Sequence, residues 1–199
     1  MRKIAILVWC LLPIAALAYH LGPGQQHMVL DSAGDALDQA EKYAADEEWS
    51  KAVVAYDLAL NNLAAEDAEA SRRIRLEKAK AQMLAAQLPA ASTDLKSLVD
   101  EMVAETDDPQ STVDEKLLAE ARSALANSQY YRTWLMRLEG LPKEVWEPEI
   151  ESARQTYKLL AESAVDDATE QQYKEDLEST IRLARMDLSD LQGLPLPSQ

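Results

Sequence analysis

Apolar positions recur along most of the chain at steps of three and four residues. The clearest stripe, in residues 112–139, contains Leu117, Leu118, Ala121, Leu125 and Leu138. Such spacing places side chains on one face of a helix, and no segment shows the sustained alternation typical of a strand. Ala, Leu, Glu, Lys and Gln, all strong helix formers, dominate between the breaks. We therefore expect an all-α protein, with helices at residues 33–46, 49–63, 66–86, 89–105, 112–139, 148–163 and 167–191.

Glycine, proline and short polar residues indicate where these helices begin and end. The stretch 106–111 (TDDPQS) is typical of a linker, and Gly140 ends the fifth helix. Ser32 is a predicted N-cap, residues 112–115 (TVDE) resemble a capping box, and residues 167–170 (DATE) resemble another. Pro148 suits a first helical turn.

The first 18 residues have the pattern of a secretory signal peptide. Arg2 and Lys3 precede an apolar run, which ends in Ala-Leu-Ala at residue 18. The run is too short to cross a hydrocarbon core of ~30 Å. We expect cleavage and export, with the periplasm as the expected compartment; the alternative is an uncleaved N-terminal anchor. The prediction continues with an extended segment at 19–32 and ends with a flexible, Pro-containing tail at 192–199.

Composition excludes several classes of function. The chain has 35 acidic against 20 basic residues, a formal charge of −15, which disfavours nucleic acid and anionic lipid as partners. Its single Cys lies in the signal-like segment. No nucleophile elbow, phosphate loop, HExxH or Rossmann glycine pattern is present, so we expect neither an enzyme nor a cofactor. His20 and His27 offer weak Cu²⁺ or Ni²⁺ binding, but a metal-free flexible leader is the favoured interpretation.

Small and aromatic residues alternate in the first half in the manner of a helical repeat. Residues 36–64 resemble a tetratricopeptide repeat, a helix-turn-helix unit of about 34 residues. The matching positions are Ala40, Tyr43, Trp49, Ala52, Tyr56 and Ala59. Gln39 and Ala64 depart from the usual pattern. A weaker copy at 75–103 aligns Ala79, Leu88, Ala91 and Leu95. Residues 112–191 show no convincing copy, with a continuation of the stack as diverged hairpins as the alternative to a separate cap.

The resemblance to bacterial exported tetratricopeptide proteins implies stacked antiparallel hairpins at 33–105, a solenoid followed by a linker at 106–111 and a C-terminal helical extension at 112–191. Generic helical hairpins are the alternative. The resemblance also implies a groove on the first-helix layer that holds acidic or C-terminal peptides; alternatively, its cations neutralise the protein's own carboxylates. The predicted groove residues are Leu37, Glu41, Arg73, Leu76, Lys80 and Met83.

Tyr130, Tyr131, Trp134 and Trp146 form a candidate aromatic patch. Aromatic residues are enriched both at interfaces and in helical cores. A buried cluster at a helix corner, with Tyr131, Leu135 and Leu138 directed inward, is the favoured interpretation.

We therefore expect a non-catalytic scaffold that binds another protein or an extended peptide in the cell envelope, with no nucleic-acid partner and no bulk membrane insertion after signal cleavage. The alternative is a structural subunit that packs on a partner through its C-terminal helices. Its apolar stripe contains Tyr173, Leu177, Ile181, Ala184, Leu188 and Leu191.

Overall fold

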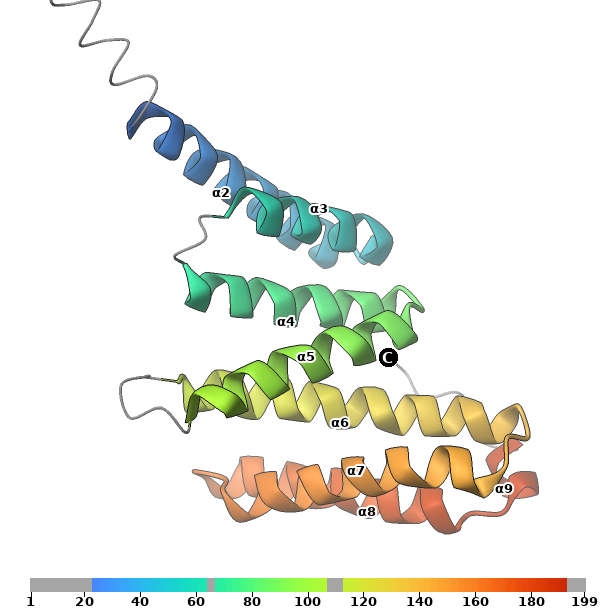
Figure 1. The fold of residues 1–199 in the computed structure, drawn as a ribbon. Helices are drawn as coiled ribbons and strands as arrows, with labels where there is room; N and C mark the ends of the chain where they lie inside the picture. Colours follow the sequence, from blue (N-terminus) through green and yellow to red (C-terminus); the bar gives the residue numbers. More distant parts are fainter. Residues whose placement is uncertain (1–22, 64–66, 107–112, 193–199) are drawn as a thin grey trace, which may run out of the picture. The chain divides into compact units, whose positions relative to one another are not determined.

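The computed structural model describes residues 23–63, 67–106 and 113–192, and over these ranges the chain is entirely helical (Figure 1). The described ranges contain eight helices and no strand, as the periodicity predicted. The helices are α2 (Pro23–Ala45), α3 (Trp49–Asn62), α4 (Ala68–Leu84), α5 (Leu88–Thr106), α6 (Glu115–Leu138), α7 (Lys143–Glu162), α8 (Asp167–Arg185) and α9 (Leu188–Gln192).

The chain divides into two compact units after Ile74, within α4. In the first unit α2 and α3 pack against each other as a hairpin. Ala40, Ala52 and Ala59 are completely buried, and Tyr56 is 4% exposed. Because an alanine side chain is a single methyl group, these positions allow close approach of the two backbones, and Tyr56 fills the space beside them.

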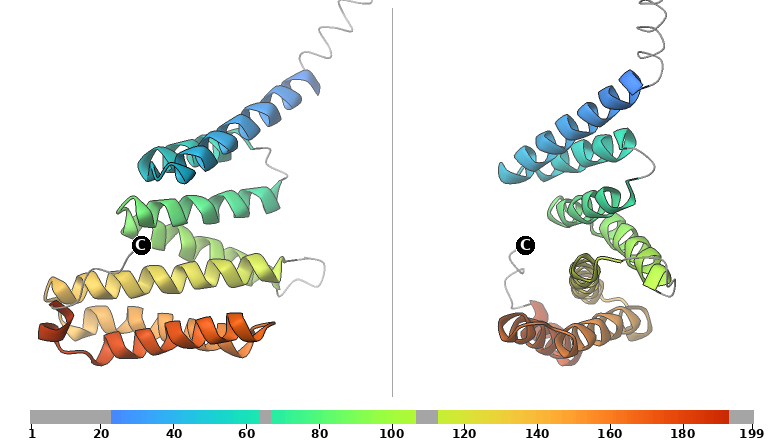
Figure 2. Two further views of the ribbon diagram at one scale, coloured as in Figure 1. Left: turned by 180° about the vertical axis from the view of Figure 1, so that it is seen from behind. Right: turned by 90° about the vertical axis from the view of Figure 1, so that its left-hand side faces the viewer.

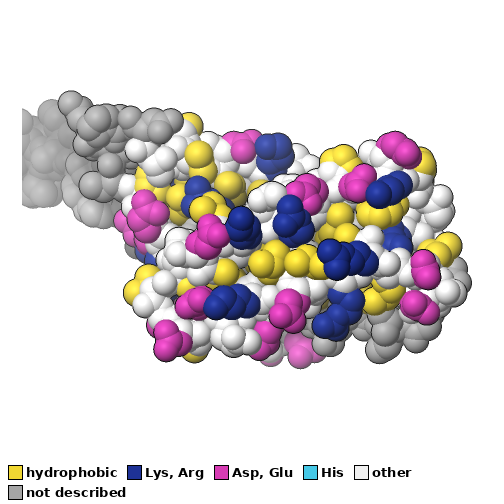
Figure 3. Space-filling model, turned by 90° about the horizontal axis from the view of Figure 1, so that it is seen from below, with side chains coloured by type: hydrophobic (Ala, Val, Ile, Leu, Met, Phe, Trp, Pro, Cys, Tyr) yellow, Lys and Arg dark blue, Asp and Glu magenta, His cyan; other side chains and the backbone are white. Residues whose placement is uncertain are grey.

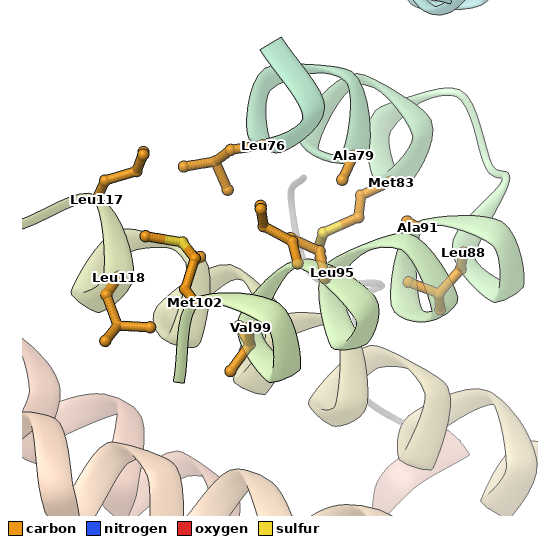
Figure 4. Packing of buried hydrophobic residues seen from close by; sticks show 12 residues of the cluster. Leu76, Ala79, Met83, Leu88, Ala91, Leu95, Val99, Met102, Leu117 and Leu118 are labelled. Atoms are coloured by element: carbon orange, nitrogen blue, oxygen red, sulfur yellow. The ribbon is translucent and has the colours of Figure 1, made fainter. Parts of the chain in front are cut away.

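In the second unit, consecutive helices pack against each other from α5 to α8, and α9 returns to α6 (Figure 2). Its largest core lies where the C-terminal half of α4 meets α5 and the start of α6. Figure 4 shows Leu76, Ala79 and Met83 of α4 in this core, together with residues of α5 and α6. Leu95 and Leu98 of α5 are completely buried in the same cluster. Full burial of a leucine contributes about 1.5–3 kcal/mol, so this core holds the three helices together.

Two further clusters join α6, α7 and α8. Tyr157 and Leu160 of α7 pack with Ala126 of α6, and Trp134 of α6 packs with Trp146 of α7. Arg137 lies over the Trp146 ring at 4.8 Å and donates hydrogen bonds to the carbonyls of Leu183 and Met186. Leu183 lies in the last turn of α8 and Met186 is the C-cap that follows it, and backbone acceptors at such a helix end lack helical partners. Arg137 thereby ties that end of α8 to α6.

The hairpins α2–α3, α4–α5 and α6–α7 are closed by the same kind of turn. Glu47, Ala86 and Gly140 have positive φ angles of 58°, 59° and 74°. In each turn the next backbone N–H donates to a carbonyl five residues earlier: Glu48 to Tyr43 at 2.8 Å, Gln87 to Gln82 at 2.8 Å and Leu141 to Met136 at 2.9 Å. The positive-φ residue donates to the carbonyl three residues earlier, which completes a Schellman motif.

Several predicted boundaries were wrong. The first helix begins at Pro23, not at residue 33, so residues 23–32 are helical and not extended. Ser32 therefore lies inside α2 instead of capping it. Pro is favourable in a first helical turn, and the Gln, Met and Leu residues after it favour the helix sufficiently to offset Gly24. The predicted extended residues 19–22 lie outside the described residues.

The start of α7 also differs from the prediction. This helix begins at Lys143 after Pro142, so Pro148 lies in its interior instead of its first turn. Pro148 has no N–H for the Glu144 carbonyl, and the packing of Trp146 and Ile150 compensates for this loss.

The acidic caps lie close to the predicted positions. Asp114 caps α6 by accepting the N–H groups of Lys116 and Leu117 at 3.0 and 3.1 Å; Thr112, the predicted cap, lies outside the described residues. Asp166, one residue before the predicted start, caps α8 by accepting the Thr169 N–H at 2.9 Å. The last predicted helix is divided, since α8 ends at Arg185 and α9 follows.

Within the part of the chain that the structure describes, no helix combines the length and the apolar character needed to cross a membrane. The signal-like residues 1–18, the linker residues 107–111 and the tail residues 193–199 lie outside the described residues, as does His20.

Candidate functional site

A pocket of about 480 Å³ lies in the second unit, between the C-terminal half of α4, the middle of α6 and the start of α8. We call it the α4–α6–α8 groove. These three helices are every second helix along this part of the chain. The residues lining the groove are Lys80, Met83, Leu84, Glu120, Ser123, Ala124, Asn127, Tyr131, Gln172 and Tyr173.

The groove combines an apolar part with polar side chains. Met83 is 8% exposed and packs in the large core, together with the partly buried Ala124 and Tyr131. Asn127 and Gln172 contribute amide groups, each able to donate and accept hydrogen bonds. No hydrogen bond to another described residue occupies the side chain of Asn127. Apolar surface with a few polar groups is typical of a binding site.

The positive charge in the groove is already compensated. Lys80 Nζ lies 2.7 Å from Glu77 Oε1, one turn earlier on α4. Both side chains are partly exposed, and such pairs contribute only about 0–1 kcal/mol to stability. The ion pair nevertheless reduces the attraction of Lys80 for an acidic ligand.

Burial and negative charge act together on the tyrosines. Burial raises the pKa of Tyr173, and the nearby Glu120 and Asp176 raise it further. Burial followed by the charge of Asp176 likewise raises the pKa values of Tyr131 and Tyr157. These phenols therefore remain neutral donors near pH 7.

Asp176 lies on α8, one turn after Gln172 and Tyr173 and on the same side of the helix. Burial, followed by the charge of Glu175, raises the pKa of its carboxyl group. Among the described residues, neither Asp176 nor Glu120 forms an ion pair with a Lys or Arg. The edge of the groove on α6 and α8 is therefore negatively charged.

The structure places two of the six predicted groove residues, Lys80 and Met83, in this pocket. Leu76 is only 1% exposed and belongs to the core, so its predicted position on a groove surface was wrong. Leu76 lies two turns before Met83 on α4 and packs among residues of α5 and α6 instead. Arg73, in the first unit, hydrogen-bonds Glu69 Oε1 at 3.0 Å.

Leu37 and Glu41 lie on α2 in the first unit, where Leu37 is half-buried and Glu41 is exposed. The repeat-packing positions on the same hairpin differ in burial. Ala40, Ala52, Tyr56 and Ala59 are buried, whereas Tyr43 and Trp49 are half-buried.

The candidate aromatic patch separates into core and groove residues. Trp134 and Trp146 are 6% and 8% exposed and belong to the cluster that joins α6 and α7, so they do not form an exposed surface. Tyr130 packs edge-on against Tyr131, with ring centroids 5.6 Å apart, and Tyr131 lines the groove. Leu135, predicted to point inward, is 45% exposed.

Most of the C-terminal apolar stripe is used within the chain. Tyr173 and Leu177 pack against α6 and α7, and Ala184 and Leu191 join the cluster around Trp134. On the face where α7 and α8 lie, Figure 3 shows hydrophobic side chains in a band interrupted by charged ones. Ile181 of this stripe is half-buried, and Leu188 is 43% exposed.

The α6 and α8 walls of the groove were not predicted from the sequence, except for Tyr131 in the candidate aromatic patch and Tyr173 in the C-terminal stripe. Glu120, Ser123, Asn127 and Tyr131 recur at three- and four-residue steps on one side of α6, so a signal existed. It lies beside the more obvious apolar stripe, in a region without a recognised repeat. Among the described residues, no three or more His, Cys, Asp or Glu side chains are grouped as a metal site would require. His27 lies within α2.

Comparisons of the chain with protein-family models, with curated proteins and with solved structures find no match.

Proposed function

We propose that this chain is an exported, non-catalytic helical-repeat protein that binds an extended peptide segment of another protein in the α4–α6–α8 groove. The observation that carries the proposal is the groove itself, with apolar surface from Met83 and Ala124 beside the amides of Asn127 and Gln172. Amide side chains bind the backbone of an extended peptide, and apolar surface accommodates its side chains.

A shared hairpin geometry supports a repeat architecture of the tetratricopeptide kind. Counted from the positive-φ residue of each turn, completely buried residues occur seven positions earlier, at Ala40, Ala79 and Thr133. The second helices of the three hairpins also have buried residues at corresponding positions, when one extra residue is counted after Gly140. Their corresponding buried positions are Ala52, Ala91 and Trp146, then Tyr56, Leu95 and Ile150, then Ala59, Leu98 and Ala153. The third hairpin thus becomes a candidate diverged repeat, the alternative that the sequence pattern left open for residues 112–191.

Export to the cell envelope remains part of the proposal because of the signal-like residues 1–18. Intact-mass measurement of the chain from its native host tests this directly. A mature amino terminus at Tyr19 is expected, and retention of residues 1–18 on the purified chain would contradict it.

Peptide binding is tested by blocking the groove. A random dodecapeptide phage library is selected on the immobilised chain, and the recovered peptides are measured by fluorescence anisotropy. Asn127→Trp fills the groove and is expected to weaken their binding at least tenfold. The matched control Asn61→Trp places the same side chain on an exposed position of α3 and is expected to leave binding unchanged. Equal binding by both variants, or no recovered peptide, would refute the proposal.

A further inference from the structure

The charges around the α4–α6–α8 groove indicate which peptide it selects, an inference that rests on the proposed function. The sequence pattern favoured an acidic ligand because of Arg73 and Lys80. In the structure Arg73 hydrogen-bonds Glu69, and Lys80 pairs with Glu77. An acidic ligand would have to displace Glu77 from Lys80, which cancels much of the gain.

The carboxylates at the opposite wall are not compensated in this way. Glu120 lines the groove on α6, and Asp176 lies one turn beyond Tyr173 on α8. Neither forms an ion pair with a described cation. Asp176 is half-buried, so its charge is poorly hydrated. An incoming cation would restore the favourable interactions that the buried carboxylate has lost.

The groove also offers aromatic and apolar contacts for the rest of a basic side chain. Tyr131 and Tyr173 contribute aromatic rings from α6 and α8. Ring faces attract a Lys or Arg head group by about 0.5–2 kcal/mol, depending on solvent exposure. Met83 and Ala124 provide apolar surface for the methylene groups that carry that head group. The net charge of −15 further favours the approach of a basic peptide.

We propose that the α4–α6–α8 groove binds peptides through a lysine or arginine side chain, with Glu120 and Asp176 as its counter-charges and Tyr131 and Tyr173 as its aromatic contacts. This specificity is opposite to the acidic-peptide binding expected from the sequence.

A double-mutant cycle tests the charge preference. The probes are a Lys-containing peptide recovered from the library and its Lys→Gln analogue, measured at 150 mM salt with the full chain. Asp176→Asn is expected to weaken the Lys peptide about tenfold, equivalent to about 1.4 kcal/mol. The same variant is expected to change binding of the Gln peptide less than twofold. Glu178→Gln removes an equal charge from an exposed site on α8 and is the matched control, with an expected effect below twofold.

The outcomes separate this inference from the proposed function. Recovered peptides that are enriched in Asp or Glu, yet still excluded by Asn127→Trp, would overturn the basic specificity while peptide binding stands. An equal effect of Glu178→Gln and Asp176→Asn would also overturn it, since that result indicates only long-range charge. The absence of any groove-dependent peptide would overturn both. Thermal melting accompanies each variant, so that weaker binding is not confused with loss of fold.

Discussion

The turns that close the three hairpins allow a prediction whose sign depends on backbone conformation alone. Ala86 and Gly140 occupy equivalent positions, with φ angles of 59° and 74°. A left-handed conformation costs a residue with a Cβ roughly 1–2 kcal/mol, whereas glycine adopts it without that cost. Ala86, in the turn between α4 and α5, is therefore strained, whereas Gly140, in the turn between α6 and α7, is not.

We predict that Ala86→Gly stabilises the chain and that Gly140→Ala destabilises it. The relief of strain at Ala86 is partly offset by the greater unfolded-state entropy of glycine, about 0.4–1 kcal/mol. A net gain of about 0.5–1 kcal/mol remains. A Cβ added at Gly140 meets no atom within 4 Å, so the substitution introduces no clash. Its cost is the backbone term alone, also about 0.5–1 kcal/mol.

Gly34→Ala is the matched control for Gly140→Ala. An added Cβ at Gly34 likewise meets nothing within 4 Å, but Gly34 lies within α2 and has no positive φ. Alanine is favoured over glycine inside a helix by about 1 kcal/mol, so this variant should be stabilised. Urea unfolding and thermal melting measure all three variants, and each kcal/mol corresponds to about 2–4 °C at this chain length. If Gly140→Ala and Gly34→Ala change stability in the same direction, the conformational argument is refuted.

Three further predictions concern the core, a helix end and a buried charge. Leu95→Ala should lower the free energy of unfolding in urea by about 2–5 kcal/mol because it opens a cavity in the core. Leu159→Ala, at a 46% exposed position on α7, should lower it by less than about 0.5 kcal/mol, and similar losses would contradict the assigned core. Arg137→Lys retains the charge but loses the planar guanidinium that reaches the carbonyls of Leu183 and Met186, so a loss of about 1–2 kcal/mol in stability is expected. Faster amide exchange at the C-terminal end of α8 should accompany that loss. The pKa of Asp176 is raised in the folded state, so the protonated carboxyl group favours the fold at low pH. This favourable contribution to folding stability is lost as the pH rises from the ordinary Asp pKa through the raised value. Asp176→Asn should therefore be more stable than the wild type at pH 7, and this difference in stability should disappear below the ordinary Asp pKa. A difference that stays constant with pH would contradict the raised pKa of Asp176.

Helix content and helix order were predictable because they depend on local sequence. Alanine-rich segments with three- and four-residue periodicity formed helices in each region expected, and the predicted fourth and fifth helices agree with α5 and α6 to within a few residues. The errors occurred where local signals conflict. Ser32 and Gly34 suggested a helix start, yet α2 continues through both, since the surrounding helix formers outweigh one unfavourable residue.

Two of the three hairpin turns could not be located in the sequence from the residues that adopt a positive φ. Gly140 is an ordinary signal for such a turn, but Glu47 and Ala86 are not, because both residue types normally favour the right-handed helix. Packing between the paired helices determines the conformation at these two positions. Tertiary contacts thus override the local preference, at a cost that Ala86→Gly measures.

The groove was only partly predictable, and the reason lies in the spacing of the hairpins. Glu47 and Ala86 are 39 positions apart, the same offset that relates the repeat-like residues 36–64 to their weaker copy at 75–103, whereas Ala86 and Gly140 are 54 apart. Much of the difference comes from the longer α5 and α6, which have 19 and 24 residues against 14 and 17 in α3 and α4. A search at constant spacing therefore misses the hairpin that contributes Glu120, Asn127 and Tyr131 to the groove. The lengthening of α6 that obscures the repeat thus lies in the helix that provides the central wall of the proposed binding site.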